Sequence, residues 1–267
     1  MIAFPNAKIN IGLQILNKRS DGYHNLETVF YPIKLFDVLE IVEAQATSLH
    51  LSGLPLPDHD DNSNLCMKAY RLLQKDFALP AFEIHLHKRI PAGGGLGGGS
   101  SDAAFLIKLI DGYCGLQLSK DTMKGYAAQL GADCAFFIEN SAQFAEGVGE
   151  RMTAVNLDLS AYHFVVVTPP VHISTAQAFS GVQAHAEGRQ LKRNISTPVA
   201  LWKDTIFNDF EYSVFPAFPE IEQLKHALYA QGAIYAAMSG SGSSVFGIFD
   251  QVPQLGLLEK NNLVFYC

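Results

Sequence analysis

One loop of this sequence has a composition that points directly to chemistry: six of the seven residues from 93 to 99 are glycine. Glycine loses more backbone entropy on folding than any other residue, so such a run needs a reason. Without Cβ atoms, several backbone N–H groups can converge on an anion, and a helix that starts near Ser101 would add its positive end. The hydroxyls of Ser100 and Ser101 can contact phosphate oxygens or Mg²⁺. The sequence therefore predicts a phosphate-binding loop. A flexible linker is the alternative, and the apolar strand before the loop and the Ala/Leu/Ile-rich helix after it disfavour it.

Two familiar phosphate-binding patterns fit the loop poorly. The Walker pattern ends in Gly-Lys-Ser/Thr, whereas Gly99 is followed by Ser100. A dinucleotide fingerprint can be laid on Gly93, Gly95 and Gly98, but no acidic residue closes a second strand about 20 positions later. Neither a P-loop NTPase nor a nicotinamide-dependent enzyme is therefore the preferred interpretation.

Size and composition restrict the class of protein. The chain has 267 residues, 48% of them hydrophobic, and a formal net charge of -7. The acidic balance argues against a nucleic-acid or membrane-surface partner, because both favour clustered Lys and Arg. The four cysteines, at 66, 114, 134 and 267, show no zinc or redox spacing. With no signal peptide at the start and no apolar run of about 20 residues, we expect a globular cytoplasmic protein with reduced thiols.

Alternation of apolar and polar residues predicts the strands. Between Lys8 and Ile15 the isoleucines point one way, while Lys8 and Asn10 point the other, which predicts a half-buried strand with a polar face. Further strands are expected over residues 38–42, 82–87, 162–168, 233–238, 245–249 and 263–266.

Caps and apolar periodicity predict the helices. They are expected from a cap at Asn62 to about residue 74, over Ala103–Tyr113 after a start near residues 100–102, from a Ser119 cap to a left-handed turn at Gly131, and over 220–231. The polar stretch 185–197 predicts a mobile loop or a weakly packed helix, and Pro253 and Gly256 predict an irregular C-terminal segment. Strands and helices mix without regular βαβα alternation, so the predicted class is α+β. A change of character near residue 150 predicts two domains, 1–152 and 153–267.

Two glycine-rich segments resemble motifs of one kinase superfamily. The string from Pro91 to Ala104, PAGGGLGGGSSDAA, resembles the second motif of the GHMP kinases, and residues 238–244, MSGSGSS, resemble the third. This resemblance implies phosphorylation of a small-molecule alcohol by ATP, with Mg²⁺ expected beside it. The ATP-binding residues it implies are Ala92, Gly93, Gly94, Gly95, Leu96, Gly97, Gly98, Gly99, Ser100, Ser101 and Asp102, with Asn64 and Leu65 on the adenine side. In such kinases a second glycine-rich turn packs beside the phosphate loop, here Ser239, Gly240, Ser241, Gly242 and Ser243.

Other blocks resemble one branch of these kinases, whose acceptor is the 2-hydroxyl group of a methylerythritol that carries a cytidine diphosphate. The blocks are AKINIGL at 7–13, DGYHNLETVF at 21–30, DVLEI at 37–41, GAD at 131–133 followed by Phe136-Phe137, and NDFE at 208–211. The resemblance implies an N-terminal domain like ribosomal protein S5 domain 2, a ferredoxin-like C-terminal domain and an active site between them. It also implies the non-mevalonate isoprenoid pathway.

The same resemblance implies roles for individual residues. Asp133 corresponds to the general base and Lys8 to a cation that stabilises the nucleophilic oxygen; Cys134 and Ala135 stand where the family usually has Val and Pro. The substrate-binding residues it implies are Asn10 for a hydroxyl or diphosphate, Tyr23 and His24 for the cytosine, Phe179 as a second stacking aromatic and Thr175 near the erythritol end. Each of three residues also has a non-functional interpretation. Asp133 could be an exposed carboxylate after a helix, Lys8 a surface lysine and Phe179 a buried core residue. We interpret Asp102 as a helix cap and not a metal ligand.

The remaining histidines predict no metal site. His85 and His87 share a strand face with Glu83, which we interpret as a solvated face. No partner is predicted for five further histidines, which are His50, His59, His163, His185 and His226.

Several functions stay open at this point. The chain could be another GHMP kinase, such as a homoserine or mevalonate kinase, or a protein of this fold that binds ligands without catalysis, and a nicotinamide-dependent oxidoreductase is a distant third. The expected partner is a small molecule with a cytidine diphosphate group, with no nucleic acid and no membrane, and the expected state is a monomer or weak homodimer.

Overall fold

The computed structural model describes residues 1–56, 63–182, 184, 189–256 and 258–267. These residues pack into two compact units, each made of discontinuous segments. The first unit comprises Met1–Ala7, Lys34–Ala92 and Gly97–Ser141, and the second comprises Lys8–Ile33, Gly93–Leu96 and Ala142–Cys267. The division at residues 152/153 stays a prediction, because these units are defined by packing and interleave along the chain.

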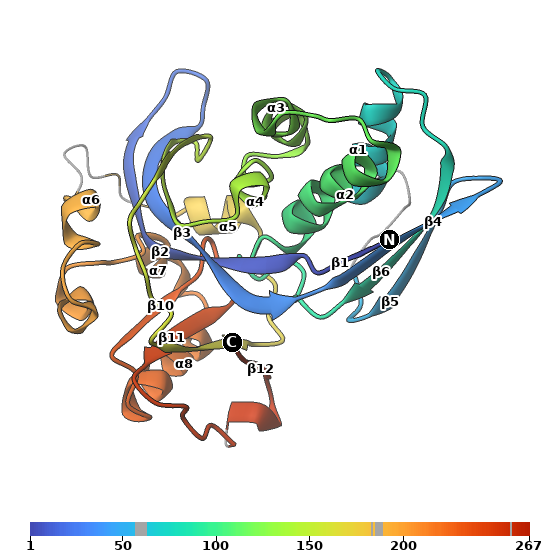
Figure 1. Cartoon of the computed structure of the whole chain (residues 1–267). Helices are drawn as coiled ribbons and strands as arrows, with labels where there is room; N and C mark the ends of the chain where they lie inside the picture. Colours follow the sequence, from blue (N-terminus) through green and yellow to red (C-terminus); the bar gives the residue numbers. More distant parts are fainter. Residues whose placement is uncertain (57–62, 183, 185–188, 257) are drawn as a thin grey trace. The chain divides into compact units, whose positions relative to one another are not determined.

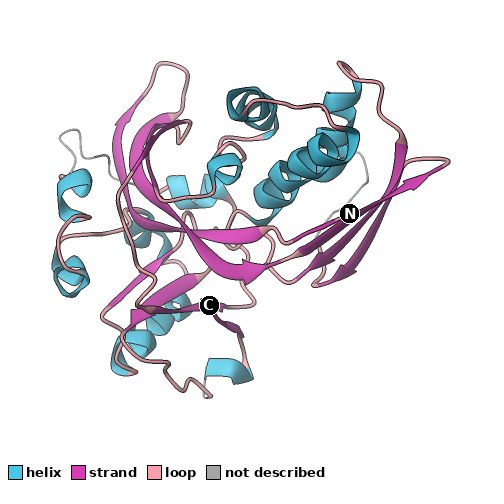
Figure 2. Cartoon of the chain, in the orientation of Figure 1, coloured by secondary structure: helices cyan, strands magenta, loops and turns pink. Residues whose placement is uncertain are grey.

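The first unit is a four-stranded sheet with helices on one face (Figures 1 and 2). Its strand order is β1 (Ile2–Ala3), β4 (Val38–Ala44), β6 (Ala81–Lys88) and β5 (Ser48–Gly53), and only the β5–β6 pair is parallel. Its helices are α1 (Leu65–Gln74), α2 (Gly98–Cys114), α3 (Lys120–Leu130) and α4 (Phe136–Glu139). In β6, Phe82, Ile84 and Leu86 are buried while Glu83 and His87 are exposed, as the alternation predicts.

The second unit contains most of a sheet with the order β2 (Asn6–Lys18), β3 (His24–Phe36), β7 (Gln143–Gly147) and β8 (Arg151–Ala154). Its other sheet has the order β10 (Tyr235–Met238), β11 (Val245–Phe249), β9 (His163–Thr168) and β12 (Leu263–Tyr266). The helical elements are α5 (Thr175–Phe179), α6 (Leu191–Asn194), η1 (Val199–Asp204), α7 (Phe210–Val214), α8 (Pro219–Ala230) and η2 (Leu258–Lys260). Helix α8 packs on β10 and β11, where Ile221, Leu224 and Leu228 join the core (Figure 1).

Four sequence expectations need correction. The cap of α1 is Asn64, whose side chain accepts a hydrogen bond from the Cys66 N–H; Asn62 lies outside the described residues. Helix α2 starts at Gly98, earlier than predicted, because the glycines themselves enter the helix. Gly131 has φ 170°, which is extended backbone and not a left-handed turn. The polar face of β2 is buried, since Lys8, Asn10 and Gln14 are each at most 3% exposed.

The α+β class is confirmed, and among the described residues no helix is both long and apolar enough to cross a membrane. Of the polar stretch 185–197, residues 185–188 lie outside the described part, and α6 occupies 191–194. His59 and His185, for which no partner is predicted, also lie outside the described residues.

Candidate active site

The glycine-rich loop runs into the first turn of α2. Gly93, Gly95 and Gly97 have φ between 70° and 76°, in the left-handed region that side chains disfavour. At Gly98 a Cβ atom would lie 2.9 Å from Cγ2 of Ile90 and 3.3 Å from Nζ of Lys88. The loop therefore requires glycine both for its backbone angles and for close packing under the helix start.

Two polar atoms in the first turns of α2 have no internal partner. Oγ of Ser101 and Oδ1 of Asp102 are buried, and within the described part of the chain neither makes a hydrogen bond. A buried polar atom without a partner is costly, and the first N–H groups of a helix lack intrahelical acceptors. An anion with its cation at this end would satisfy both. The residues present thus fit the triphosphate and Mg²⁺ that the loop predicts.

A buried ion network supports the start of α2. Nζ of Lys88 donates to Oδ2 of Asp37 and, at 2.6 Å, to Oδ2 of Asp102. Burial raises the pKa of Asp102 to about 7; Lys88 opposes this shift, and the charge of Asp37 adds to it. Burial lowers the pKa of Lys88, but the two carboxylates outweigh it and leave that pKa raised. Asp102 therefore anchors the helix through Lys88, and the cap of α2 is Gly97, not Asp102 as predicted.

Replacing Lys88 with methionine is expected to lower the free energy of unfolding by about 3–5 kcal/mol, because two buried carboxylates lose their cation. Chemical denaturation measures this change. The control is Lys120→Met, because Lys120 is 68% exposed in its contact with Glu139 and its loss should cost under about 1 kcal/mol. If both variants lost equally little stability, the network would not stabilise the fold.

Asp133 lies in the turn between α3 and α4. It is half-buried, whereas its neighbour Cys134 is fully buried beside Ser100 of α2. Burial raises the pKa of the Cys134 thiol to about 11, with Ser100 acting in the opposite direction, so this thiol stays protonated at neutral pH. The turn that bears Asp133 is therefore held against the first turn of α2.

Lys8 lies on β2 in the second unit, with its side chain directed at the glycine loop. Its ammonium group donates to Oδ1 of Asn10 at 2.6 Å and to the carbonyl oxygen of Gly95 at 3.1 Å. It also lies 5.0 Å from the centre of the Phe30 ring. Asn10 in turn donates to Oγ1 of Thr28. These contacts orient a buried cation beside residues 93–96.

The second glycine-rich turn packs against the same part of the loop. Oγ of Ser239 donates to the carbonyl oxygen of Gly95 at 3.0 Å, and the Ser244 N–H donates to that of Gly94 at 3.2 Å. A Cβ atom on Gly95 would lie only 2.0 Å from the Ser239 carbonyl oxygen. The structure thus brings the two glycine-rich segments together, as the resemblance implies.

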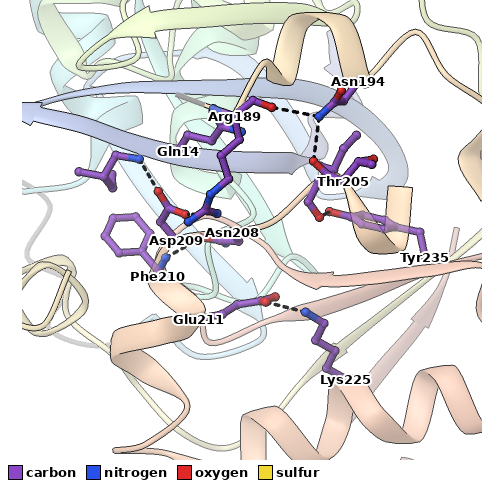
Figure 3. A network of polar contacts seen from close by, with 12 residues as sticks. Gln14, Arg189, Asn194, Thr205, Asn208, Asp209, Phe210, Glu211, Lys225 and Tyr235 are labelled. Carbon is purple, nitrogen blue, oxygen red and sulfur yellow. Dashed lines mark hydrogen bonds and ion pairs between the residues drawn. The ribbon is translucent and has the colours of Figure 1, made fainter. Parts of the chain in front are cut away.

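Residues of the NDFE block, 208–211, belong to a polar network that Figure 3 shows from close by. The Asn208 amide donates to the carbonyl oxygens of Met238 and Gly240, at 2.7 and 2.8 Å. Asp209 accepts from the Ile15 N–H and pairs with Arg189, and Glu211 accepts from the Met238 N–H and pairs with Lys225. Asn208 and Glu211 of the NDFE block, to which the sequence alone assigns no role, therefore bond Gly240 of the second glycine-rich turn and Met238 just before it.

The predicted cytosine-side residues separate into two groups. The rings of His24 and Phe179 stack, with centroids 5.1 Å apart and an interplanar angle of 19°, and Phe210 packs edge-on against Phe179. Tyr23, at the tip between β2 and β3, is 66% exposed. Thr175 is the exposed first residue of α5.

The chain matches two family models, "GHMP kinases N terminal domain" over residues 64–140 and "GHMP kinases C terminal" over residues 199–264. It is 55% identical to a 4-diphosphocytidyl-2-C-methyl-D-erythritol kinase of Bacteroides fragilis, over 93% of this chain and 92% of that one. A kinase of the same name from Chlorobium luteolum is 39% identical over 91% and 87% of the two chains.

Comparison with solved structures points to the same kinases as the sequence matches. The crystal structure of a 4-(cytidine 5'-diphospho)-2C-methyl-D-erythritol kinase superposes with a TM-score of 0.84 at 28% identity, covering 100% of this chain and 98% of that chain. The mevalonate kinase of Methanococcus jannaschii superposes with a TM-score of 0.69 at 15% identity, covering 100% and 97%. The second likeness shows the fold alone.

Proposed function

The chain belongs to the family of 4-diphosphocytidyl-2-C-methyl-D-erythritol kinases, within the GHMP kinases, and we propose how its own residues perform that reaction. The chain is an ATP-using kinase, and its acceptor carries a cytidine diphosphate group. The group transferred is the γ-phosphoryl of ATP, and the attacking atom is the 2-hydroxyl oxygen of the methylerythritol, in the non-mevalonate route to isoprenoid precursors. A bond forms between this oxygen and phosphorus, the bond from phosphorus to the β-phosphate oxygen breaks, and ADP leaves.

Asp133 is the residue that accepts the proton of the attacking hydroxyl. A carboxylate in a half-buried turn, next to a helix start suited to phosphate, has the chemistry of a general base. Lys8 stabilises the negative charge that grows on the attacking oxygen. The observation that supports this role is its pair of contacts, to Asn10 and to the loop carbonyl of Gly95, which orient the ammonium group.

The loop and α2 hold the donor. The N–H groups at the start of α2 bind phosphate oxygens, and the Ser101 hydroxyl is the candidate contact for Mg²⁺ or a phosphate oxygen. When bound, Mg²⁺ would neutralise charge on the phosphates during transfer. On the acceptor side, the stacked pair of His24 and Phe179 offers an aromatic surface for the cytosine ring.

We also place the enzyme in the cytoplasm, as a monomer or weak homodimer. All four cysteines are free thiols, which suits a reducing compartment where ATP is available.

A coupled assay of ADP release tests the acceptor. Turnover is expected with 4-diphosphocytidyl-2-C-methyl-D-erythritol and not with mevalonate or homoserine, because only the first offers a base to the His24–Phe179 surface. Replacing Phe179 with alanine should raise KM for this substrate about tenfold with little change in KM for ATP. Turnover of mevalonate without turnover of the cytidylyl compound would overturn the assignment.

A further inference from the structure

The parallel pairing of β5 with β6 gathers metal-ligating side chains on the exposed face of the first unit's sheet. His50 of β5 lies in register with His85 of β6, and Ser48 lies in register with Glu83. Residues in register share a face, so His50 joins the Glu83 and His85 side chains that alternation already places there. Sequence spacing alone could not bring His50 to this face.

From this juxtaposition we propose that His50, Glu83 and His85 form a binding site for a divalent transition metal ion, with Zn²⁺ as the physiological candidate. One ligand atom from each of the three residues lies within 4.8 Å of those of the other two. The imidazole rings of His50 and His85 stack with centroids 4.8 Å apart, and Nε2 of His85 lies 3.7 Å from Oε2 of Glu83. None of these residues belongs to the candidate active site.

The ligand types select the metal. Two imidazoles and one carboxylate suit Zn²⁺, Ni²⁺ or Cu²⁺, whereas Mg²⁺ prefers an all-oxygen set. The site is therefore not the Mg²⁺ site of the kinase reaction. Three protein ligands leave one tetrahedral position for water, and the half-exposed side chains of Glu83 and His85 admit it.

Small side-chain movements would complete the geometry. Tetrahedral ligands about 2.1 Å from zinc lie about 3.4 Å from one another, so the three ligand atoms must close by roughly 1 Å. The strand backbone is fixed by pairing, and exposed side chains can change rotamer at little cost. One ring nitrogen of His50 already bonds the Ser48 hydroxyl at 3.1 Å, a contact of the kind that orients a ligating imidazole.

A bound ion would stabilise the pairing of the edge strand β5 with β6. β5 is the last strand of its sheet and pairs only with β6 among the described strands. An ion shared by His50 on β5 and two residues on β6 would link the strands, and it would favour the folded chain because the unfolded chain lacks the preformed site.

Titration of the full chain with Zn²⁺, without nucleotide, tests the proposal by calorimetry. We expect one equivalent to bind in the micromolar range and saturating Zn²⁺ to raise Tm by about 5 °C. His50→Gln and His85→Gln should each weaken binding at least tenfold and abolish the Tm shift. His87→Gln is the matched control, because His87 lies on the same face but bonds Ser52. The Zn²⁺ affinity of this variant should stay within twofold of the wild-type value.

The absorption spectrum of bound Co²⁺ distinguishes binding at this site from binding at the cysteine thiols. Co²⁺ at His50, Glu83 and His85 should give tetrahedral d–d bands without a thiolate charge-transfer band, and kinase activity of the His50→Gln variant should match that of the wild type. Zinc binding that is unchanged in both His50→Gln and His85→Gln, or a thiolate–cobalt band, would overturn the proposal.

Discussion

Replacing Asp133 with asparagine is expected to lower kcat by about 10²–10⁴-fold, the range in which a general base contributes to proton transfer. The amide keeps the shape of the side chain but cannot accept the proton. KM for ATP should change little, because the α2 start and its buried Ser101 and Asp102 are untouched. Steady-state kinetics with both substrates measures the split between kcat and KM.

Asp121→Asn is the matched control for this variant. Asp121 is an exposed aspartate in the first turn of α3, in the same unit, and its loss should leave kcat unchanged. Circular dichroism and thermal melting should show both variants folded, because Asp133 is only half-buried. Unchanged phosphoryl transfer in Asp133→Asn would show that another group takes the proton.

Replacing Gly95 with alanine is expected to reduce kcat/KM by about 100-fold or more. The new methyl group would meet the Ser239 carbonyl oxygen at 2.0 Å, and the φ of 76° is unfavourable for alanine. The loop and the second glycine-rich turn must then separate, which also moves the Gly95 carbonyl that Lys8 contacts. A displacement of about 1 Å at reacting groups costs about 10²-fold in rate.

Gly125→Ala supplies the comparison. Gly125 lies inside α3, and no atom of the described residues outside its own helical backbone lies within 4 Å of the position that an added methyl group would take. Alanine there should raise stability by about 0.5–1 kcal/mol and leave kinetics unchanged. Kinetics and denaturation of the two variants together separate a local clash from a general effect of losing glycine. A fully active Gly95→Ala enzyme would show that the contact with Ser239 is not needed.

Local patterns were sufficient for elements whose signals lie within a few residues. The alternation from Phe82 to His87 predicts β6, and Ser119 caps α3 as its residue type predicts. Local patterns do not predict features that depend on the packing of distant segments. The alternation of polar and apolar residues in β2 predicts that the face with Lys8 and Asn10 is exposed to solvent. This face is buried, because the glycine loop and Ser239 lie against it.

The candidate site shows the same division. The types and spacing in the Pro91–Ala104 string were enough to predict phosphate binding, because glycine density followed by a helix start is itself the physical requirement. Nothing local indicates that Lys88 bridges Asp37 and Asp102, since they lie 51 and 14 positions from Lys88 and the three meet only when the β3–β4 junction, β6 and α2 pack.

By itself, then, the sequence determined the α+β class and the family of kinases, and it predicted that the glycine-rich loop binds phosphate, because these depend on residue types in short contiguous blocks. Only the tertiary structure decided which partners those blocks meet: Gly95 with Lys8 and Ser239, His24 with Phe179, and His50 with His85. The physical reason is that strand register and the packing of distant segments set these contacts, and neither is encoded in the periodicity of a single segment.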